Sequence, residues 1–562
     1  ACAGPWLGVA LFEATMPDDV VRTHSVLDSS MIRWSIRCVA AVLVYATLLA
    51  LHPQPAWADT LEVCRTGCFY VTIGSALADA EPGDIVWVRA GEYRLGEPVR
   101  LRPGVTLRGE DPQHPAWTTI RADGGNAVIG TGRLLTNTCV LEGFTIIAGS
   151  GRGLYIQDGA AEIIRNNIFS GTVTSFKGAG IRIDDEGTVP TISDNVFINN
   201  SSSQEGGAIY IHDASPIIFN NQFVNNHSDR DGGALSIRTD ERPDQQAVIV
   251  HNEFTYNTAS AKGGAIYVER SKPLIQSNRI LHNAAEAGAG IFVNSCCSAG
   301  QALVQGNWLS YNATYGAGQE SVGGALAIAN QAQVHVDGNV LRQNSAARGG
   351  GIYIASSAPR ITNNVFAANG RTEVWVEGSF PHIINNSILG AGGPETVGIE
   401  LLGASHARLV NNIIAFAGYG VRGDGVAAAD IRHNDVWMNV VANYEGVEAG
   451  PTNLSVEPQL RDPASGDYHL QPGSPLIDAG TATEAPTTDL DGEARPVDGD
   501  GDGIVEADIG ADEYYPPPAT ATPTSTATST PTATPTLTAT ATRTPPPAPS
   551  ARYVYLPIIH KP

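Results

Sequence analysis

Gly206-Gly207-Ala208-Ile209-Tyr210-Ile211 is one copy of a short pattern that recurs along the middle of the chain. Related copies begin at Gly232, Gly263, Gly323 and Gly349. Each copy is a glycine pair followed by an alternating run rich in Ile, Val and Tyr, which is typical of short strands. Glycine permits positive φ angles and close approach of neighbouring backbone. The pattern therefore predicts repeated strands, each entered through a tight bend.

An asparagine followed two residues later by an apolar side chain marks the second half of the same repeat. These positions are Asn167, Asn195, Asn221, Asn252, Asn278, Asn307, Asn339, Asn364, Asn386, Asn412 and Asn434. Their spacing of 22 to 32 residues is typical of a solenoid. In several repeats a further asparagine follows, at Asn200, Asn226, Asn257 and Asn369. Because the strands are short and alternating, we expect an all-β, right-handed parallel β-helix in which stacked asparagines bond from coil to coil.

The two ends of the chain have a different composition from the repeat. Met31, the basic residues Arg33 and Arg37, an apolar run over 38–51 and Ala56-Trp57-Ala58 are typical of a secretory signal peptide. The alternative is an uncleaved N-terminal anchor. Residues 516–550 are almost only Thr, Pro, Ala and Ser, which predicts a disordered stalk. The apolar residues at the very end are either a surface-attachment signal or a frayed terminus.

These features divide the chain into seven segments. We expect an over-extended start over 1–30, a signal peptide over 31–58, an N-terminal cap and first coils over 59–150, regular coils over 151–445, a C-terminal cap over 446–515, the stalk over 516–550, and a short apolar segment over 551–562. A short amphipathic helix over 75–81 is expected to cover the first coil. The mature chain is expected to be monomeric and to lack a transmembrane helix.

Export would place five cysteines in an oxidising compartment. Cys64 and Cys68 can close a local disulfide, Cys139 is expected to be buried and unpaired, and Cys296 and Cys297 remain. No Cys/His cluster has zinc spacing. The formal charge of -23 argues against a nucleic-acid partner, which requires a basic surface.

The strand after each glycine pair gives two sets of candidate binding residues. One outward position per coil is expected at Tyr155, Arg182, Tyr210, Ser236, Tyr267, Phe292, Ala327 and Tyr353. Its aromatic members either stack against sugars or simply cover the sheet.

Ionisable residues follow the same strands and should also align between coils. The candidates for acid/base catalysis are Asp184, Asp185, His212, Asp213 and Arg238, with Glu269 and Arg270 beside them for ligand binding. A solvated ladder of alternating charge is the competing interpretation.

An acidic loop near the C-terminus is the clearest metal-binding motif. Asp498, Asp500 and Asp502 alternate with glycines, and Ile504 follows, as in the first half of a Ca2+ loop. The twelfth position is Ile509, so Glu506 or Asp508 would have to supply the closing ligand. We expect a bound Ca2+ to order the cap, and the alternative is a flexible acidic turn.

The repeat resembles the pectate-lyase-like right-handed β-helix superfamily. The Gly-Gly-Ala-Ile and Phe-x-x-Asn motifs, as at 206–209 and 223–226, resemble polymorphic outer-membrane protein repeats. The stretch 472–480, with 508–514, is similar to choice-of-anchor type Q bacterial surface proteins. The resemblance implies an exported or surface-displayed protein but no single activity, because this fold carries enzymes, adhesins and stalks.

Three functions are compatible with these observations. The first is a surface-displayed binding or adhesion rod that recognises an extracellular polysaccharide or a cell-surface glycan. The alternative is a polysaccharide lyase or glycoside hydrolase, although the chain has no Gly-His-Gly and no Arg-Ile-Lys motif of the polygalacturonase type. The third is a structural spacer.

Overall fold

The computed structural model describes residues 58–240, 246–294, 301–316, 318–424 and 430–517. Several predicted features lie outside these residues: the start 1–30, the signal peptide 31–58 except its last residue, the stalk 516–550 except its first two residues, and the segment 551–562. Cys296 and Cys297 also lie outside them.

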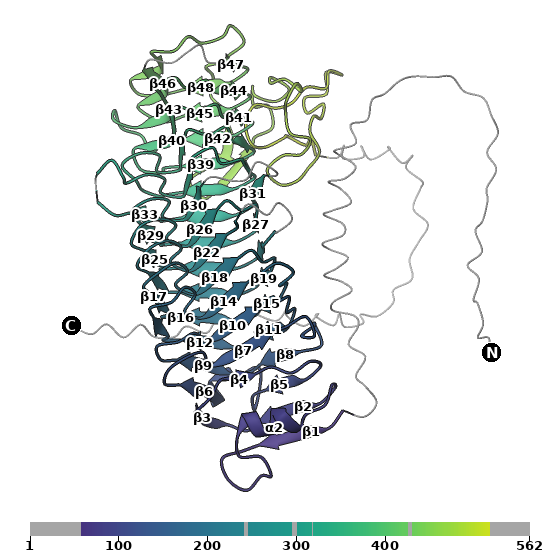
Figure 1. The fold of residues 1–562 in the computed structure, drawn as a ribbon. Coiled ribbons are helices and arrows are strands. Elements are labelled where there is room, and N and C mark those ends of the chain that lie inside the picture. The colour runs from purple at the N-terminus through teal and green to yellow at the C-terminus, as the bar shows by residue number, and fades with distance from the viewer. Residues whose placement is uncertain (1–57, 241–245, 295–300, 317, 425–429, 518–562) are drawn as a thin grey trace, which may run out of the picture. The chain divides into compact units, whose positions relative to one another are not determined.

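The described chain winds into a parallel β-solenoid of about 14 coils (Figure 1). Two of its long sheets have 14 strands and one has 15, and all neighbouring strands within them are parallel. Each coil passes in turn through sheets A, B and C, and six coils add a short strand of sheet D between B and C. The predicted all-β solenoid is confirmed. Within the described part of the chain, no helix is long and apolar enough to cross a membrane.

Sheet A consists of β1 (Thr60–Val63), β2 (Ile85–Val88), β5 (Thr106–Arg108), β8 (Val140–Glu142), β11 (Ile163–Arg165), β15 (Thr191–Ser193), β19 (Ile217–Phe219), β23 (Val248–Val250), β27 (Leu274–Gln276), β31 (Ala302–Gln305), β35 (Val334–Asp337), β38 (Arg360–Thr362), β41 (His382–Ile384), β44 (Arg408–Val410) and β47 (Asp430–Arg432). Sheet B consists of β3 (Gly91–Leu95), β6 (Thr118–Ala122), β9 (Thr145–Ala148), β12 (Ile168–Ser170), β16 (Val196–Ile198), β20 (Gln222–Val224), β24 (Glu253–Thr255), β28 (Arg279–Leu281), β32 (Trp308–Ser310), β36 (Val340–Arg342), β39 (Val365–Ala367), β42 (Ser387–Leu389), β45 (Ile413–Ala415) and β48 (Asp435–Trp437).

Sheet C consists of β4 (Val99–Arg100), β7 (Val128–Thr131), β10 (Leu154–Gln157), β14 (Ile181–Asp184), β18 (Ile209–His212), β22 (Leu235–Arg238), β26 (Ile266–Glu269), β30 (Ile291–Asn294), β34 (Leu326–Ala329), β37 (Ile352–Ala355), β40 (Thr372–Glu377), β43 (Val397–Leu402), β46 (Tyr419–Asp424) and β49 (Ala442–Glu445). Sheet D consists of β13 (Val173–Thr174), β17 (Ser201–Ser202), β21 (His227–Ser228), β25 (Thr258–Ala259), β29 (Ala284–Ala285) and β33 (Ala313–Thr314).

The glycine pair bends the chain from sheet D into sheet C. Gly206 has a φ of 72°, in the left-handed region that favours glycine. A Cβ atom at Gly207 would collide with the carbonyl oxygen of Gly233 in the next coil. The first glycine is therefore required by backbone conformation and the second by the close approach of coils.

The eleven predicted asparagines form one continuous ladder between sheets A and B. In Asn195, for example, the backbone N and Nδ2 both donate to Oδ1 of Asn221 at 3.0 Å. The ladder ends on a twelfth member, Asn453, which accepts from Asn434. A second ladder contains the four predicted members together with Asn283, Asn312 and Asn344. It ends on Glu373, which accepts from the backbone N and Nδ2 of Asn369.

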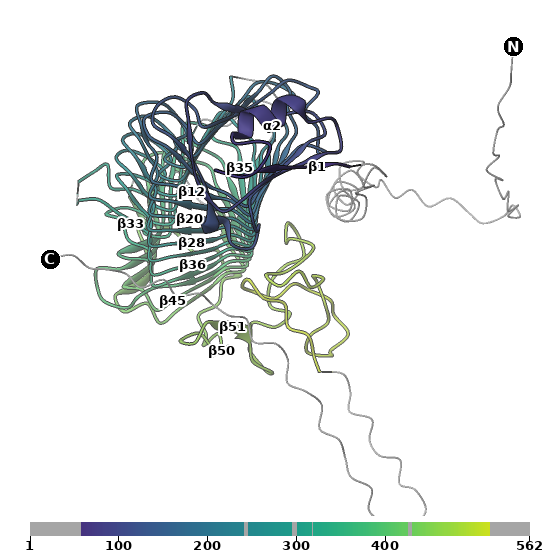
Figure 2. The same cartoon turned by 90° about the horizontal axis from the view of Figure 1, so that it is seen from below.

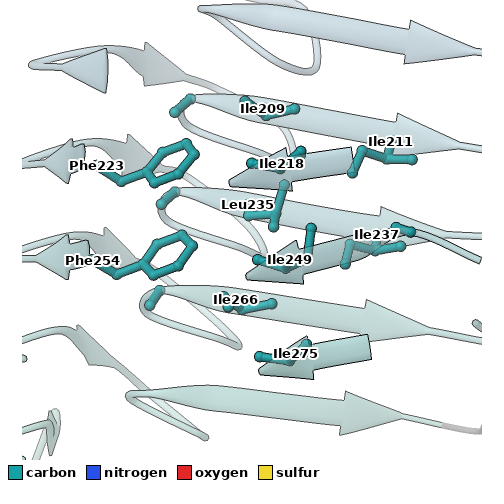
Figure 3. Packing of buried hydrophobic residues seen from close by; sticks show 14 of the residues in the cluster. Ile209, Ile211, Ile218, Phe223, Leu235, Ile237, Ile249, Phe254, Ile266 and Ile275 are labelled. Carbon is teal, nitrogen blue, oxygen red and sulfur yellow. The ribbon is translucent and has the colours of Figure 1, made fainter. Parts of the chain in front are cut away.

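The core is a continuous apolar column inside the coils. Phe169, Phe197, Phe223 and Phe254 stack nearly parallel, with ring centroids 4.6 to 4.9 Å apart. Figure 3 shows Phe223 and Phe254 beside Leu235 and isoleucines whose side chains point inward from sheets A and C. Burying each coil against the next supplies the apolar contact that a single coil lacks.

Helix α2 (Ile73–Asp79) covers the first coils, two residues earlier than the sequence predicted (Figure 1). Thr72 caps it by accepting a bond from the Ser75 backbone N, and Ile73, Ala76 and Leu77 are buried against the core. The predicted disulfide Cys64–Cys68 and the buried free Cys139 are both present. A 3-10 helix, η1 (Pro115–Trp117), lies in a later loop.

The segment 446–515 covers the end of the solenoid and then runs back along its side. Leu454 adds a parallel bridge to Asp435 in the last strand of sheet B. An antiparallel hairpin follows, formed by β50 (Leu460–Asp462) and β51 (Asp467–Leu470), below sheet B in Figure 2. Beyond it, Asn363, Asn385 and Asn411 bind backbone groups of the segment.

Candidate functional site

Sheet C aligns the candidate residues as the sequence predicted. The outward position is in register from Tyr155 through Arg182 and Tyr210 to the later members of the column. The last position of each strand aligns Asp184, His212, Arg238 and Glu269 in four successive coils.

Most aromatic members of this outward column are covered, as in the interpretation that they simply cover the sheet. Tyr210, Tyr267 and Phe292 are 2%, 5% and 4% exposed, and Tyr353 is also buried, whereas Tyr155 stays partly exposed. The loops between sheets D and C fold over these rings: the ammonium of Lys177 lies 4.5 Å from the Tyr210 ring centroid. Sequence alternation places a residue on the outer face of a sheet but does not reveal that a loop covers that face.

A pocket of about 320 Å³ opens where this cover is incomplete. Four successive coils contribute to it, through the loops before β10, β14 and β18, through β14 and β18 themselves, and through the end of β22. Its lining residues are Arg152, Phe176, Lys177, Arg182, Gln204, Tyr210, His212, Arg238 and Asp240. Of the predicted residues it therefore contains Arg182, Tyr210, His212 and Arg238.

Most cations of this pocket have a carboxylate partner. Arg182 Nε lies 2.6 Å from Asp184 Oδ2, Lys177 Nζ lies 3.0 Å from Glu205 Oε2, and Arg238 Nη1 lies 3.3 Å from Glu269 Oε2. His212 Nε2 lies 3.2 Å from Asp240 Oδ2. Burial would raise the pKa of Asp240, but hydrogen bonding to His212 and the charge of Arg238 keep that pKa below its ordinary value.

Arg152 is the exception, and sequence reasoning missed it. Its Nε donates to the Lys177 carbonyl at 3.0 Å, and its guanidinium lies 4.6 Å from the Phe176 ring centroid and 5.5 Å from that of Tyr155. Among the described residues, no carboxylate forms an ion pair with it. Burial and the charge of Arg182 lower the pKa of Arg152, since both disfavour its charged form. Arg152 precedes its strand, outside the alternating positions that the sequence pattern singles out.

The phenol groups beside this pocket are held protonated. Burial and the neighbouring Asp184 raise the pKa of Tyr155 to about 12. Burial also raises the pKa of Tyr210, whose hydroxyl oxygen accepts a bond from Lys177 Nζ at 3.1 Å. Each phenol can therefore donate a hydrogen bond at neutral pH.

The remaining acidic candidates lie in a separate place. Asp185 and Asp213 line a neighbouring pocket of about 470 Å³ with Arg133, Asp158 and Glu186. Asp213 Oδ1 accepts from the Asp240 backbone N at 2.8 Å, so it orders the turn. Asp184 is buried beneath Arg182, and Arg270 adopts a positive φ at the equivalent turn. Of the five catalytic candidates, His212 and Arg238 thus line one pocket, Asp185 and Asp213 line the other, and Asp184 lines neither.

The acidic C-terminal loop brings together a different set from the predicted one. Asp478, Asp498 and Asp500 place carboxylate oxygens within 4.8 Å of one another and could hold a metal ion. Asp502 accepts from the Ile504 backbone N, Glu506 from the Ala482 backbone N, and the buried Asp508 from the Asp478 and Tyr514 backbone N atoms. Burial and the charge of Glu513 raise the pKa of Asp508 to about 8.

Asp478 was missed because it precedes the loop by 20 residues, and its Oδ2 accepts from the Gly499 and Asp500 backbone N atoms. Two further groups of the same kind are His212 with Asp213 and Asp240, and His469 with Asp491 and Asp512.

Comparison with known proteins decides the family. The model of the right-handed β-helix region matches residues 118–241, 228–366 and 318–453. The chain belongs to the right-handed β-helix family. The handedness predicted from the sequence is thereby confirmed.

Solved structures of this β-helix fold include enzymes that act on polysaccharides. The catalytic unit of a GH87 α-1,3-glucanase from Streptomyces thermodiastaticus is 16% identical, with a TM-score of 0.33, over 73% of this chain and 70% of that chain. A PL6 alginate lyase in complex with a trisaccharide is 14% identical, with a TM-score of 0.34, over 68% and 85%. Pectate lyase Pel9A is 11% identical, with a TM-score of 0.27, over 82% and 97%. No curated protein matches the sequence of this β-helix protein.

Proposed function

We propose that this β-helix protein is an exported, surface-displayed binding rod that recognises an acidic extracellular polysaccharide in the Arg152 pocket. The signal-peptide pattern, the Thr/Pro-rich stalk and the resemblance to outer-membrane repeats and anchored surface proteins support export and display. The observation that carries the ligand is Arg152, a cation without a carboxylate partner among the described residues.

The chemistry of the pocket fits an acidic sugar better than a neutral one. An arginine fork binds a carboxylate through two parallel hydrogen bonds. The half-exposed ring of Phe176, beside Arg152, offers an apolar face to the sugar ring. Lys177 and Arg238 pair with the partly exposed carboxylates of Glu205 and Glu269, so both can also turn to a ligand carboxylate. Arg182 is held by the buried Asp184.

Binding of the full chain to polygalacturonate, alginate and a neutral glucan tests this proposal. Arg152→Ala should weaken retention on the uronate polymers about tenfold, since removal of one charge-assisted bond is worth roughly 1.5–3 kcal/mol. Arg371→Ala, an exposed arginine paired with Glu395, is the matched control and should bind normally. Equal retention of the Arg152→Ala variant and wild type on every polymer would refute the assignment.

Catalysis by the same pocket is the second candidate. His212 is paired with Asp240, and the protonated Tyr210 lies beside it, so a base and an acid are available for chain cleavage by a lyase or a hydrolase. An enzyme would release new chain ends, unsaturated ones in the case of a lyase, and His212→Ala would stop their release. If the protein is retained on a polysaccharide but releases no new chain ends, the result favours the binding rod over an enzyme.

We also propose that Asp478, Asp498 and Asp500 bind Ca2+ and that the ion orders the segment 446–515. Asp478 would supply the carboxylate that Ile509 cannot. Ca2+ should raise the melting temperature of wild type but not of Asp498→Asn/Asp500→Asn. An unchanged melting temperature of wild type in Ca2+ and in chelator would contradict this.

A further inference from the structure

The outer corner of sheet B carries an exposed aromatic column that the proposed function does not use. Tyr256, His282 and Tyr311 stack in successive coils, with ring centroids 5.0 Å apart at both steps and interplanar angles of 9° and 5°. Tyr256 and Tyr311 remain 53% and 49% exposed. In the two preceding coils the same turn position holds Asn199 and Asn225, which bond to each other.

The backbone at this turn does not favour aromatic residues. Tyr256, His282 and Tyr311 each have a φ of 56°, in the left-handed region that asparagine tolerates and that a bulky side chain such as tyrosine rarely adopts. Because Tyr256 and Tyr311 remain about half exposed, the area that they bury does little to offset this strain. Strained residues that persist at an exposed place point to a role outside folding.

A pocket of about 350 Å³ lies against the end of this column. It spans β28, β32 and β36, and Figure 2 shows β28 and β36 in the row of sheet B strands. Trp308 faces Arg279 in the neighbouring strand, and Ser310 faces Arg342 in the next. The Trp308 Nε1 atom donates to Ser310 Oγ at 3.2 Å, which fixes the indole on the sheet surface. The pocket therefore combines two ring systems, the partly buried Trp308 and the exposed Tyr311, with two arginines.

The arginines of this pocket are available for a ligand anion. In the described part of the chain, neither Arg279 nor Arg342 forms an ion pair with a carboxylate, although the whole chain carries a formal charge of -23. Arg342 Nη2 donates to the Ala464 carbonyl oxygen at 3.1 Å, so the C-terminal hairpin holds it at the pocket edge. The two residues are two coils apart, about 10 Å along the axis. That separation is comparable with the distance between alternate rings of a sugar chain.

We propose that this pocket is a second glycan-binding site, in which Trp308 and Tyr311 pack against sugar rings and Arg279 and Arg342 bind carboxylate or sulfate groups. Guanidinium forks match both anions, and the rings supply the apolar contact that sugar faces require. The site lies on sheet B, away from the Arg152 pocket on sheet C. The second-site proposal therefore goes beyond the proposed function and can be correct even if the Arg152 pocket binds no polysaccharide.

Titration of the full chain with short oligosaccharides tests the second site. The probes are an oligogalacturonate, a sulfated dextran oligosaccharide and an uncharged dextran oligosaccharide, and the readout is isothermal titration calorimetry. The variants are Trp308→Ala/Tyr311→Ala and Arg279→Gln/Arg342→Gln, each made in wild type and in an Arg152→Ala background. Tyr315→Ala removes an equally exposed tyrosine outside the pocket and is the control. Circular dichroism confirms that each variant is folded.

In the Arg152→Ala background, both pocket variants should weaken binding of an acidic oligosaccharide at least about fivefold, and Tyr315→Ala should not. The carboxylated and sulfated probes then identify the preferred anion. Unchanged binding of both acidic probes by the two pocket variants would overturn the proposal, as would complete loss of binding in Arg152→Ala alone. If Arg152→Ala binds like wild type and the pocket variants do not, the second site stands and the proposed function fails.

Discussion

At the scale of single residues, Glu162 lies inside the solenoid rather than on its surface. It is fully buried, and neither carboxylate oxygen has a hydrogen-bond partner in the described part of the chain. Gly130 of β7, one coil earlier, leaves the space that the carboxyl group occupies, because a Cβ there would collide with Oε1. Burial raises the pKa of Glu162 to about 7. Sequence alone could not locate this residue, since its environment is set by a glycine 32 positions away.

Replacement of Glu162 by Met should stabilise the protein at high pH. The pKa of Glu162 is raised in the folded state, from an ordinary value of 4.5 to about 7. Its contribution to stability is therefore complete below pH 4.5 and is lost as the pH rises through 7, a total of about 3 kcal/mol. The free energy of unfolding of Glu162→Met minus that of wild type, measured in guanidinium chloride, should be larger at pH 8 than at pH 4.5. A pH-independent difference would show that Glu162 is ionised or solvated in the folded protein.

At the scale of elements, the sequence predicts the features that a local pattern encodes. It misses the features that depend on contacts between coils. All eleven asparagines of the first ladder were identified, because each stands at a fixed distance from an inward apolar residue. Asn283, Asn312 and Asn344 of the second ladder were missed because Ile280, Leu309 and Leu341 replace the phenylalanine of the motif. Sheet D was missed because two-residue strands are too short to show alternation. The binding pocket was only half predicted, since Arg152 and Phe176 come from the loops around these strands.

Removal of one ladder member should destabilise the solenoid locally. Asn252 Nδ2 donates to Ile218 O, Val250 O and Asn278 Oδ1, and its Oδ1 accepts from Asn221. Asn252→Ala leaves these buried groups unpaired and should lower the free energy of unfolding by about 3 kcal/mol or more. Gln222→Ala, an exposed change in the neighbouring strand of sheet B, is the control and should have little effect. Urea denaturation gives the free energy of unfolding of both variants. If Asn252→Ala were as stable as Gln222→Ala, the ladder bonds would make no net contribution to stability.

At the scale of the whole molecule, the segment 446–515 connects parts of the chain that are far apart in sequence. Arg495 and Glu513 form an ion pair with no exposed side-chain area, with Nε 2.8 Å from Oε2. Arg495 Nη1 donates to Asn363 Oδ1, 132 residues earlier. The acidic composition of this segment predicted a metal loop but not its path along the coils, because that path depends on turn residues of a distant repeat.

Loss of the Arg495 side chain should therefore release this segment and weaken only the last coils. Arg495→Met leaves the Glu513 carboxylate buried without its partner, a change that typically lowers stability by 3–5 kcal/mol. In a solenoid each coil is stabilised mainly by its neighbours, so the effect should fade with distance from the contact. Hydrogen exchange should show lost protection in β51, which belongs to the segment, and in β42 and β45, which the segment contacts. Protection in β10, β14 and β18 should be normal. The exposed Arg461→Met is the control. Uniform loss of protection from β1 to β49 would instead show that the solenoid unfolds as one cooperative unit.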